Sequence, residues 1–201
     1  MLILVRHGEA NYNNEDIYGH VTGNDLTTKG TLQMNLLALR LKDILTDKEF
    51  TFYSSDSSRA MASSLIIAEK LNKRPSFTKE LRSTFNGTDL VLLEDVNKTY
   101  KPGIDWRPKG DAESWREHFV RISNFMNTIS QDINILIVTH GNPVIAAVQW
   151  WLGFDEKSLE KHFFMTETEN AGITMLDFNQ KGDRNIICLN EKSHLSIRSS
   201  E

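Results

Sequence analysis

Two histidines in this sequence each follow an apolar, β-prone run and each precede a glycine. Arg6-His7-Gly8-Glu9 follows the run 1–5, and Thr139-His140-Gly141-Asn142 follows the run 133–138. Ligands of open α/β sheets bind at the carboxyl ends of the strands, so we expect the two imidazoles to lie side by side. Each glycine would let the backbone turn sharply and approach a ligand closely. One histidine after a strand is usually an ordinary loop or core residue, but the repeated pattern favours a functional site.

Histidines of this kind can carry phosphoryl chemistry. A neutral imidazole is a competent nucleophile and can form a covalent phospho-intermediate. Phosphoryl transfer also needs groups that stabilise charge on the phosphoryl oxygens, and the planar guanidinium of arginine binds such oxygens in pairs. Arg6 adjoins His7, and Arg59 follows a serine-rich stretch where a strand gives way to a helix. The backbone N–H groups at a helix start would also attract an anion.

Zinc binding is the alternative function for two neighbouring histidines. A catalytic zinc generally takes three protein ligands, and the HxxxH and HExxH spacings are absent from this sequence. The other histidines show no ligand pattern; they are His20, His118, His162 and His194. We therefore predict no metal site.

The elements that must position these side chains alternate between strands and helices. Expected strands cover residues 1–5, 50–53, 75–78 and 133–138, and a hairpin is expected from 172–178 and 185–189. Expected helices cover residues 28–45, 56–71, 112–129 and 142–152. The pattern predicts an α/β fold: a three-layer sandwich with a mostly parallel central sheet, helices on both faces and a terminal β-hairpin at one edge.

Apolar residues at helical spacing predict which helix faces are buried. The expected buried stripes are Leu32, Leu36, Leu39 and Leu45 in the first helix, Met61, Leu65, Ala68 and Leu71 in the second, and Trp115, Phe119, Ile122, Met126 and Ile129 in the third. Thr28 is the expected N-cap of the first helix, and Asn142 followed by Pro143 is the expected start of the fourth. Trp150-Trp151 and Phe163-Phe164 are expected in the core or in a dimer contact.

The length and composition indicate a single domain spanning residues 1–201. The segment 86–109 is the least regular and is expected to form a lid or insertion over the site. Within it Trp106, Arg107 and Lys109 could close over an anionic or aromatic group. The alternative is a surface loop with one buried tryptophan.

The charge and cysteine content exclude several classes of protein. The net charge is −4 and no long run of Lys or Arg occurs, which argues against nucleic-acid or membrane partners. Cys188 is the only cysteine, so no intrachain disulfide can form. The apolar start is too short for a signal peptide, and we expect a cytoplasmic protein that acts on a small phosphorylated molecule as a monomer or homodimer.

An ordered set of motifs resembles the histidine phosphatase (phosphoglycerate mutase-like) superfamily over essentially the whole chain. Arg6-His7-Gly8-Glu9 with Asn13 resembles the signature of that family. Leu26-Thr27-Thr28-Lys29-Gly30 with Gln33, Ser54 through Arg59-Ala60, Gly110 through Glu113-Ser114, and Thr139-His140-Gly141 follow in the order of the family. The closing strand and tail of the family are similar to Asn190 with Ser193-His194-Leu195.

The resemblance implies roles for individual residues. His7 would be the nucleophile that becomes phosphohistidine, while Arg6, Arg59 and His140 would surround the phosphoryl group. Asn13 and the backbone near Gly8 and Gly141 would assist, and no metal or organic cofactor would be needed. Glu9 could be a site carboxylate, but we favour a structural role for it.

One position departs from the family pattern. Ser83 stands where the family usually supplies a glutamate as general acid, and a hydroxyl is a poor proton donor by comparison. Another carboxylate could substitute: Glu113 is our candidate, ahead of Glu80, Asp89 and Glu94. The other accounts are a substrate whose leaving group needs little protonation, or a chain that binds phosphorylated ligands and turns them over poorly. Ser83 and Arg107 are also expected at the substrate.

The sequence therefore predicts a phosphatase that hydrolyses a small phosphorylated substrate through phosphohistidine on His7. The first alternative is a phosphoglycerate mutase, although the chain looks short of the insertions that true mutases carry. The second is a weakly catalytic binding protein for phosphorylated ligands.

Overall fold

The computed structural model describes most of the 201 residues. The described residues are 1–11, 17–18, 25–85, 91–92, 98, 100–101, 103–108, 110–130 and 132–196. Asn13, Lys109 and much of the expected lid at 86–109 lie outside them. The domain boundaries and the lid therefore stay predictions.

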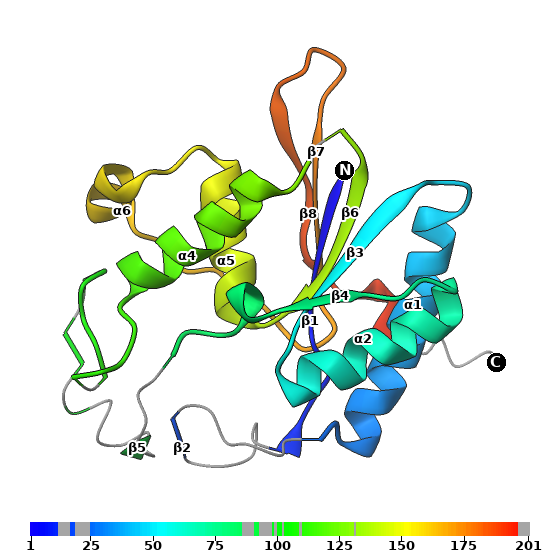
Figure 1. Ribbon diagram of the computed structural model, residues 1–201, viewed down its shortest axis with the longest axis horizontal. Helices are drawn as coiled ribbons and strands as arrows, with labels where there is room; N and C mark the ends of the chain where they lie inside the picture. The colour runs from blue at the N-terminus through cyan, green and yellow to red at the C-terminus, as the bar shows by residue number, and fades with distance from the viewer. Residues whose placement is uncertain are drawn as a thin grey trace.

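A six-stranded sheet forms the centre of the molecule, in the order β4-β3-β6-β1-β7-β8 (Figure 1). Its strands are β1 (Leu2–Arg6), β3 (Phe50–Ser55), β4 (Ser76–Thr78), β6 (Asn134–Thr139), β7 (Ile173–Phe178) and β8 (Arg184–Glu191). The first four in the order run parallel, whereas β7 and β8 form an antiparallel hairpin beside β1. The predicted fold class, with a terminal hairpin at one edge of a mostly parallel sheet, is confirmed.

Helices cover both faces of the sheet (Figure 1). One face carries α1 (Thr28–Leu45) and α2 (Ser58–Leu71). The other carries α4 (Trp115–Thr128) and α5 (Gly141–Trp151), with α6 (Glu156–His162) packed beside α4. Short 3-10 helices occupy Lys79–Leu81 and Ser193–Leu195, and β2 (Ile17–Tyr18) pairs with β5 (Val91–Leu92) in a separate small sheet.

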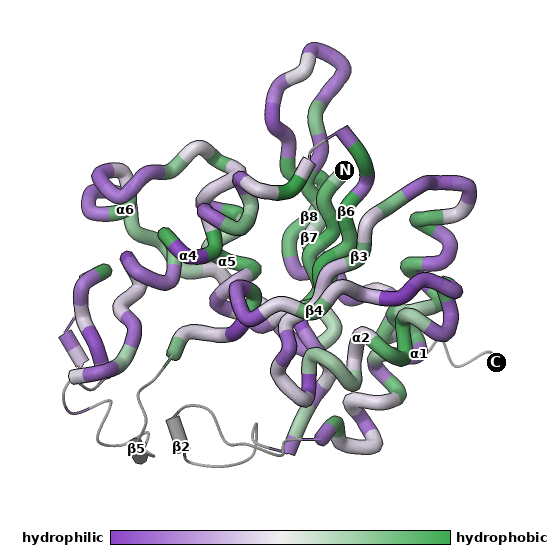
Figure 2. Tube along the Cα trace, in the orientation of Figure 1, coloured by the Kyte–Doolittle hydropathy of each residue, from purple (hydrophilic) through white to green (hydrophobic). Residues whose placement is uncertain are grey.

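Strand β1 is apolar on both faces because it lies between the two helix layers. Leu2 and Leu4 join the core cluster with α4 and α5, while Ile3 and Val5 join the cluster with α1 and α2. This division follows from the alternation of side chains along a strand. Figure 2 shows the central strands as a hydrophobic band within a more polar periphery.

The helix starts differ from the sequence-based expectation by up to three residues. Helix α2 begins at Ser58 rather than at 56, and α4 begins at Trp115 rather than at 112. Helix α1 is capped by Thr27, whose Oγ1 accepts from Gly30 N at 2.9 Å, so Thr28 is the first helical residue. Helix α5 begins at Gly141 with His140 in the N-cap position, one residue before the expected Asn142. The expected catalytic histidine is therefore held at a helix terminus.

The predicted buried faces are right for α4 and only partly right for α1 and α2. All five expected residues of the α4 stripe are buried. In α1, however, Leu32 is 50% exposed and Leu39 is 47% exposed, and in α2 Leu65 is 54% exposed. Leu45 of the expected α1 stripe is buried, and the other buried residues of α1 are Gly30, Met34, Leu37, Ala38 and Leu41.

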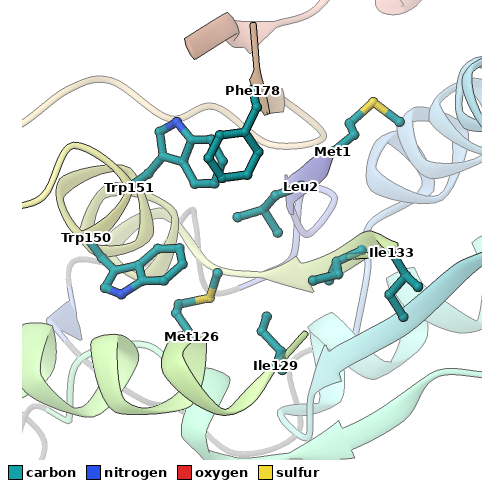
Figure 3. A pocket seen from close by; sticks show the side chains of 9 residues that line it. Met1, Leu2, Met126, Ile129, Ile133, Trp150, Trp151 and Phe178 are labelled. Carbon is teal, nitrogen blue, oxygen red and sulfur yellow. The ribbon is translucent and has the colours of Figure 1, made fainter. Parts of the chain in front are cut away.

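An apolar hollow lies at the amino-terminal end of the central strands, away from the two histidines (Figure 3). Trp150 and Trp151 border it and are buried, and the Trp151 ring packs at 5.0 Å from the Phe178 ring. The hollow has room for about 10 Å³, close to a single water molecule. It is a packing defect of the core, and the two tryptophans are core residues.

Candidate active site

His7 and His140 meet where β1 and β6 end. The parallel register pairs Arg6 with Thr139, so the next residue of each strand lies at the same edge of the sheet. The two imidazole rings are 5.0 Å apart between centroids and are inclined by 67°. His7 is fully buried and His140 is 2% exposed. The structure thus brings together the two histidines that the sequence paired.

The hydrogen bonds of His7 define its tautomer. Nδ1 lies 2.7 Å from the carbonyl oxygen of Gly8, which can only accept, so Nδ1 carries the proton. Nε2 accepts a hydrogen bond from Nε of Arg59 at 3.2 Å. Burial, followed by the positive charges of Arg59 and Arg6, holds the pKa of His7 well below its usual range. His7 is therefore a neutral imidazole whose basic nitrogen faces a guanidinium.

Two arginines surround this nitrogen from different elements. Arg59 lies in the first turn of α2 and is only 3% exposed. Arg6 is half-buried and donates through Nη1 to the carbonyl oxygen of Thr168. Its Nε is buried and has no hydrogen-bond partner among the described residues. A guanidinium whose buried Nε has no such partner, and whose charge acts on His7, is suited to bind an anionic oxygen.

Two serines that sequence reasoning missed hold His140. Ser55 Oγ and Ser57 Oγ each lie 3.1 Å from Nε2 of His140 and 3.0 Å from each other. They come from the junction between β3 and α2, which also supplies Arg59. This run contains four serines in five positions, a composition that is typical of an ordinary loop. The contact with His140 depends on the neighbouring strand β6, so the sequence alone does not indicate it.

Gly8 serves close packing between the β1 loop and α1. A Cβ atom on Gly8 would lie 2.6 Å from the carbonyl oxygen of Gly30, and one on Gly30 would lie 1.9 Å from that of Glu9. The Gly8 amide donates to Ser63 Oγ at 3.1 Å. Its N–H is thus engaged within the protein, and the predicted phosphate contact at Gly8 would require that bond to be exchanged.

Glu9 has the structural role that we favoured. Its carboxylate accepts from Thr27 Oγ1 at 2.9 Å and from Lys29 Nζ at 2.7 Å. Its amide donates to Gln33 Oε1 at 2.9 Å. Glu9 therefore ties the loop after β1 to the start of α1.

Gly141 opens α5 beside the arginine at the end of β1. A Cβ atom there would lie 2.5 Å from Thr168 Oγ1 and 3.9 Å from Arg6 Cδ, so a side chain would require Thr168 to move. The backbone N–H groups of a helix start can bind an anion, and the role of Gly141 at the phosphoryl group stays a prediction.

The loop before β7 fixes the backbone of the nucleophile and was not singled out from the sequence. Asn170 Nδ2 donates to the carbonyl oxygen of His7 at 3.0 Å, and Ala171 N lies 3.1 Å from that of Arg6. Ala171 is buried and has a φ of 57°. An alanine in this conformation gives no sequence signal, because glycine or asparagine usually marks it.

Glu113 is enclosed by positive and hydrogen-bonding groups. Arg121 forms a two-point ion pair with its carboxylate, through Nε at 2.9 Å and Nη2 at 2.8 Å. His118 Nδ1 lies 3.3 Å from Oε2, and the backbone N–H of Phe85 donates to the same oxygen at 3.1 Å. The carboxylate is therefore satisfied by partners within the protein.

This environment disfavours the acid role that we expected of Glu113. Burial raises the pKa of its carboxyl, but hydrogen bonds from Arg121 and His118 outweigh burial and lower the pKa to about 2. A general acid needs a pKa near the working pH so that it carries the proton it must donate. The geometry instead gives Glu113 a positioning role.

The Glu113–Arg121 pair clamps the segment that carries Ser83. Arg121 also donates to the carbonyl oxygens of Glu80 at 2.6 Å, Arg82 at 3.1 Å and Ser83 at 3.3 Å. Ser83 itself is half-buried.

Arg107 is engaged away from the two histidines. It donates to the carbonyl oxygen of Ala112 at 2.6 Å and to the carboxylate of Glu117 at 2.7 Å. These bonds fasten its loop to the start of α4. The predicted contact of Arg107 with substrate would compete with both.

The described part of the chain contains no cluster of three or more His, Cys, Asp or Glu side chains suited to a metal ion. Within that same part, every helix is too short or too polar to cross a membrane.

Comparisons with known proteins agree with this geometry. The family model of the histidine phosphatase superfamily (branch 1) matches residues 2–191. A Hydrogenobacter thermophilus protein named provisionally as phosphoserine phosphatase 2 is 28% identical over 204 residues, covering 96% of each chain. A Thermoplasma acidophilum 2,3-bisphosphoglycerate-dependent phosphoglycerate mutase is 29% identical over 180 residues, covering 87% of this chain and 86% of its own.

Solved structures share the fold. A mycobacterial glucosyl-3-phosphoglycerate phosphatase, solved with VO3, aligns with a TM-score of 0.76 and 18% identity over 94% of this chain and 98% of its own. The assignment of the chain to a family rests on the match of the family model over nearly the whole chain. The protein belongs to branch 1 of the histidine phosphatase superfamily and is a histidine phosphatase by enzyme class.

Proposed function

We propose that this protein hydrolyses a small phosphorylated molecule through a phosphohistidine formed on Nε2 of His7. The observation that carries the proposal is the tautomer of His7. Its proton is held on Nδ1 by Gly8, which leaves the lone pair on Nε2. The depressed pKa keeps the ring neutral at physiological pH, so this lone pair is available as a nucleophile.

In the first step Nε2 attacks phosphorus, and the bond from phosphorus to the substrate oxygen breaks. Arg59 exchanges its hydrogen bond with His7 for bonds to the phosphoryl oxygens, and the buried Nε of Arg6 adds a further donor. In the second step water attacks phosphorus, the P–N bond breaks, and inorganic phosphate leaves with His7 restored. His140, held by its two serines, lies beside the phosphoryl group throughout.

Protonation of the leaving oxygen is the weak point of this site. Ser83 is a poor acid, and Glu113 is held as a carboxylate. We therefore expect the rate of the first step to depend steeply on the acidity of the leaving alcohol. Substrates with acidic leaving groups should be hydrolysed well, and simple alkyl phosphates slowly.

A phosphoglycerate mutase is the second candidate, because the Thermoplasma acidophilum relative carries that name. A mutase returns the phosphoryl group from histidine to substrate, whereas a phosphatase releases it to water. Incubation with 3-phosphoglycerate distinguishes the two, since only a mutase forms 2-phosphoglycerate without releasing phosphate.

The test is hydrolysis of p-nitrophenyl phosphate between pH 5 and pH 8, comparing the wild type with His7→Ala. We expect activity in the wild type and a loss of at least about a thousandfold in the variant, because the nucleophile is removed. His162→Ala is the matched control, since His162 is exposed at the end of α6 and should leave the rate unchanged.

Acid quenching during turnover should trap a phosphorylated protein that is absent from His7→Ala. A wild type that binds phosphate but hydrolyses nothing would overturn the phosphatase and support the binding protein. Activity that survives His7→Ala would overturn the assignment of the nucleophile.

A further inference from the structure

A pocket of about 190 Å³ opens between the start of α4, the start of α5 and the loop at 100–108. Its walls are largely aromatic: the rings of Tyr100, Trp106, Trp115 and Phe163 line it together with Met165. Tyr100 packs against Trp106 at 5.0 Å between ring centroids, and Trp115 packs against Phe163 at 5.6 Å. These two edge-to-face pairs form opposing parts of one aromatic lining.

The topology places this pocket at the carboxyl edge of the sheet, where His7 and His140 lie. Helix α4 leads into the amino-terminal end of β6, so the start of α4 is at the opposite end, beside His140. Asn142, two residues after His140, lines the pocket and donates through Nδ2 to Thr84 Oγ1 at 2.7 Å. The pocket and the histidine site therefore share the first turn of α5.

The charge of the lining is the informative feature. The described residues that form it include no Lys or Arg, and Glu113 is their one charged group. The loop at 100–108 and its flanks carry Lys98, Lys101 and Arg107, but none of these is a lining residue: the two lysines are exposed, and Arg107 is bonded to Ala112 and Glu117. Lys109 lies outside the described residues. Because the carboxylate of Glu113 is paired with Arg121, the described lining offers no unpaired cation to a carboxylate or second phosphate, which would have to give up its hydration there without a charged partner.

The Glu113 charge does not make the pocket a site for cations. Arg121 approaches the carboxylate with two nitrogens, so the ion pair is close to neutral as a unit. What remains is aromatic surface with two neutral polar groups, Thr84 and Asn142. An apolar cavity of about 150 Å³ is sufficient to hold a benzene ring, so this pocket is large enough for one aryl group.

We propose that the pocket is the specificity site for the organic part of the substrate, and that it selects phosphomonoesters with an uncharged aromatic group. This inference rests on the proposed function, because it assigns the phosphoryl group of the same substrate to His7. The proposal implies that phosphoglycerate is a poor substrate for this enzyme, because its organic part carries a carboxylate.

The test uses phosphonates, which share a head group and cannot be hydrolysed, as competitive inhibitors of p-nitrophenyl phosphate turnover. The three probes are 2-phenylethylphosphonate, 2-carboxyethylphosphonate and 2-aminoethylphosphonate, whose tails are aromatic, anionic and cationic. Because no leaving group is involved, their inhibition constants report on the pocket alone. We expect the phenyl probe to bind on the order of tenfold more tightly than either charged probe.

Two variants test whether the aromatic pocket is the source of the preference for the phenyl probe. Trp106→Ala should remove most of the preference for the phenyl probe while leaving inhibition by inorganic phosphate unchanged; Phe77→Ala, an exposed aromatic on β4, is the matched control. Met165→Arg adds a cation at a position that is 52% exposed and should tighten the carboxyethyl probe about fivefold. Leu152→Arg, 45% exposed beyond the end of α5, is its control.

Equal inhibition by the three probes, or tighter binding of a charged probe, would overturn the inference while leaving the phosphatase intact. If p-nitrophenyl phosphate is not hydrolysed at all, the proposed function fails. Calorimetric titration with the same three phosphonates then still measures whether the pocket prefers the aromatic, the anionic or the cationic tail.

Discussion

At the scale of single residues, the His7 site depends on one guanidinium in direct contact with the nucleophile. Arg59 is buried and its Nε bonds to the nitrogen that attacks phosphorus. We expect Arg59→Lys to lower kcat for p-nitrophenyl phosphate by about a hundredfold, because an ammonium cannot bind two phosphoryl oxygens in the same plane. Steady-state kinetics measure the loss, with Lys42→Arg on the surface of α1 as a charge-preserving control. A change below about threefold would contradict a direct role for Arg59.

Glu113 gives the second prediction at this scale. Glu113→Gln removes the negative charge opposite Arg121 and should reduce the free energy of unfolding by about 2 kcal/mol. It should change kcat for p-nitrophenyl phosphate by less than about threefold, since the carboxyl does not carry a proton. Urea denaturation and steady-state kinetics test the two statements separately.

Glu160→Gln is the matched control for Glu113→Gln, because Glu160 pairs with Arg116 on the surface. A loss of kcat of about a hundredfold in a folded Glu113→Gln variant, larger for alkyl than for aryl substrates, would restore the general-acid role.

The residues that could be predicted from the sequence are those whose neighbours in the chain identify them. His7, His140 and Arg59 each sit at a recognisable junction between a strand and the following segment. The role of Glu113 could not be predicted in this way, because the pKa of its carboxyl depends on Arg121. Arg121 is two helical turns away and contacts Glu113 only when α4 is formed. Asn170 was missed because its partner, the His7 carbonyl, is distant in sequence.

At the scale of elements, the junction from β3 to α2 orients both sides of the site. Its serines contact Nε2 of His140, and its first helical turn carries Arg59. We expect the double variant Ser55→Ala with Ser57→Ala to lower kcat about tenfold with little change in KM, because the His140 ring loses the bonds that fix its orientation.

The split between kcat and KM provides a readout that a loss of folded protein would not reproduce, because kcat is counted per folded enzyme molecule. Ser130→Ala, exposed after α4, is the control. An unchanged kcat in a folded double variant would show that the serines do not position His140.

The strands were predicted well and the helix faces less well, for a physical reason. Continuous apolar runs such as β1 and β6 have one explanation, a strand buried on both faces. Helix α1 carries leucines on more than one side, so several stripes fit its sequence. Contact with the sheet selects Leu37 and Leu41, and leaves Leu32 and Leu39 at the surface.

At the scale of the whole molecule, buried neutral histidines link stability to pH. Burial lowers the pKa of both His7 and His118, and Arg59 and Arg6 lower that of His7 further. In the unfolded chain an imidazole titrates near pH 6.5, so below that pH the unfolded state binds protons that the folded state does not. The free energy of unfolding should therefore fall as the pH drops from 7.5 to 5.5, on the order of 1 kcal/mol for each buried imidazole.

Urea denaturation at the two pH values measures this slope. His7→Asn should reduce it, whereas His162→Asn, at an exposed position, should not. The carboxyl of Glu113 does not interfere, because it is ionised in both states across this range and its contribution is lost only as the pH falls from about 4.5 towards 2. Stability that is constant or rises on acidification would contradict the neutral state of the histidines.

The position of β1 also has a consequence for the order of assembly. The strand that carries the nucleophile is translated first, yet its two partners in the sheet, β6 and β7, are made of residues 134–139 and 173–178. A nascent chain stalled on the ribosome with residue 160 at the tunnel exit has exposed His7 but lacks β7 and the Asn170 contact. Such a chain should be inactive towards p-nitrophenyl phosphate, and activity should appear in a stalling series only once residue 178 has emerged. The nucleophile is thus among the first groups of the site to be synthesised and among the last to be enclosed.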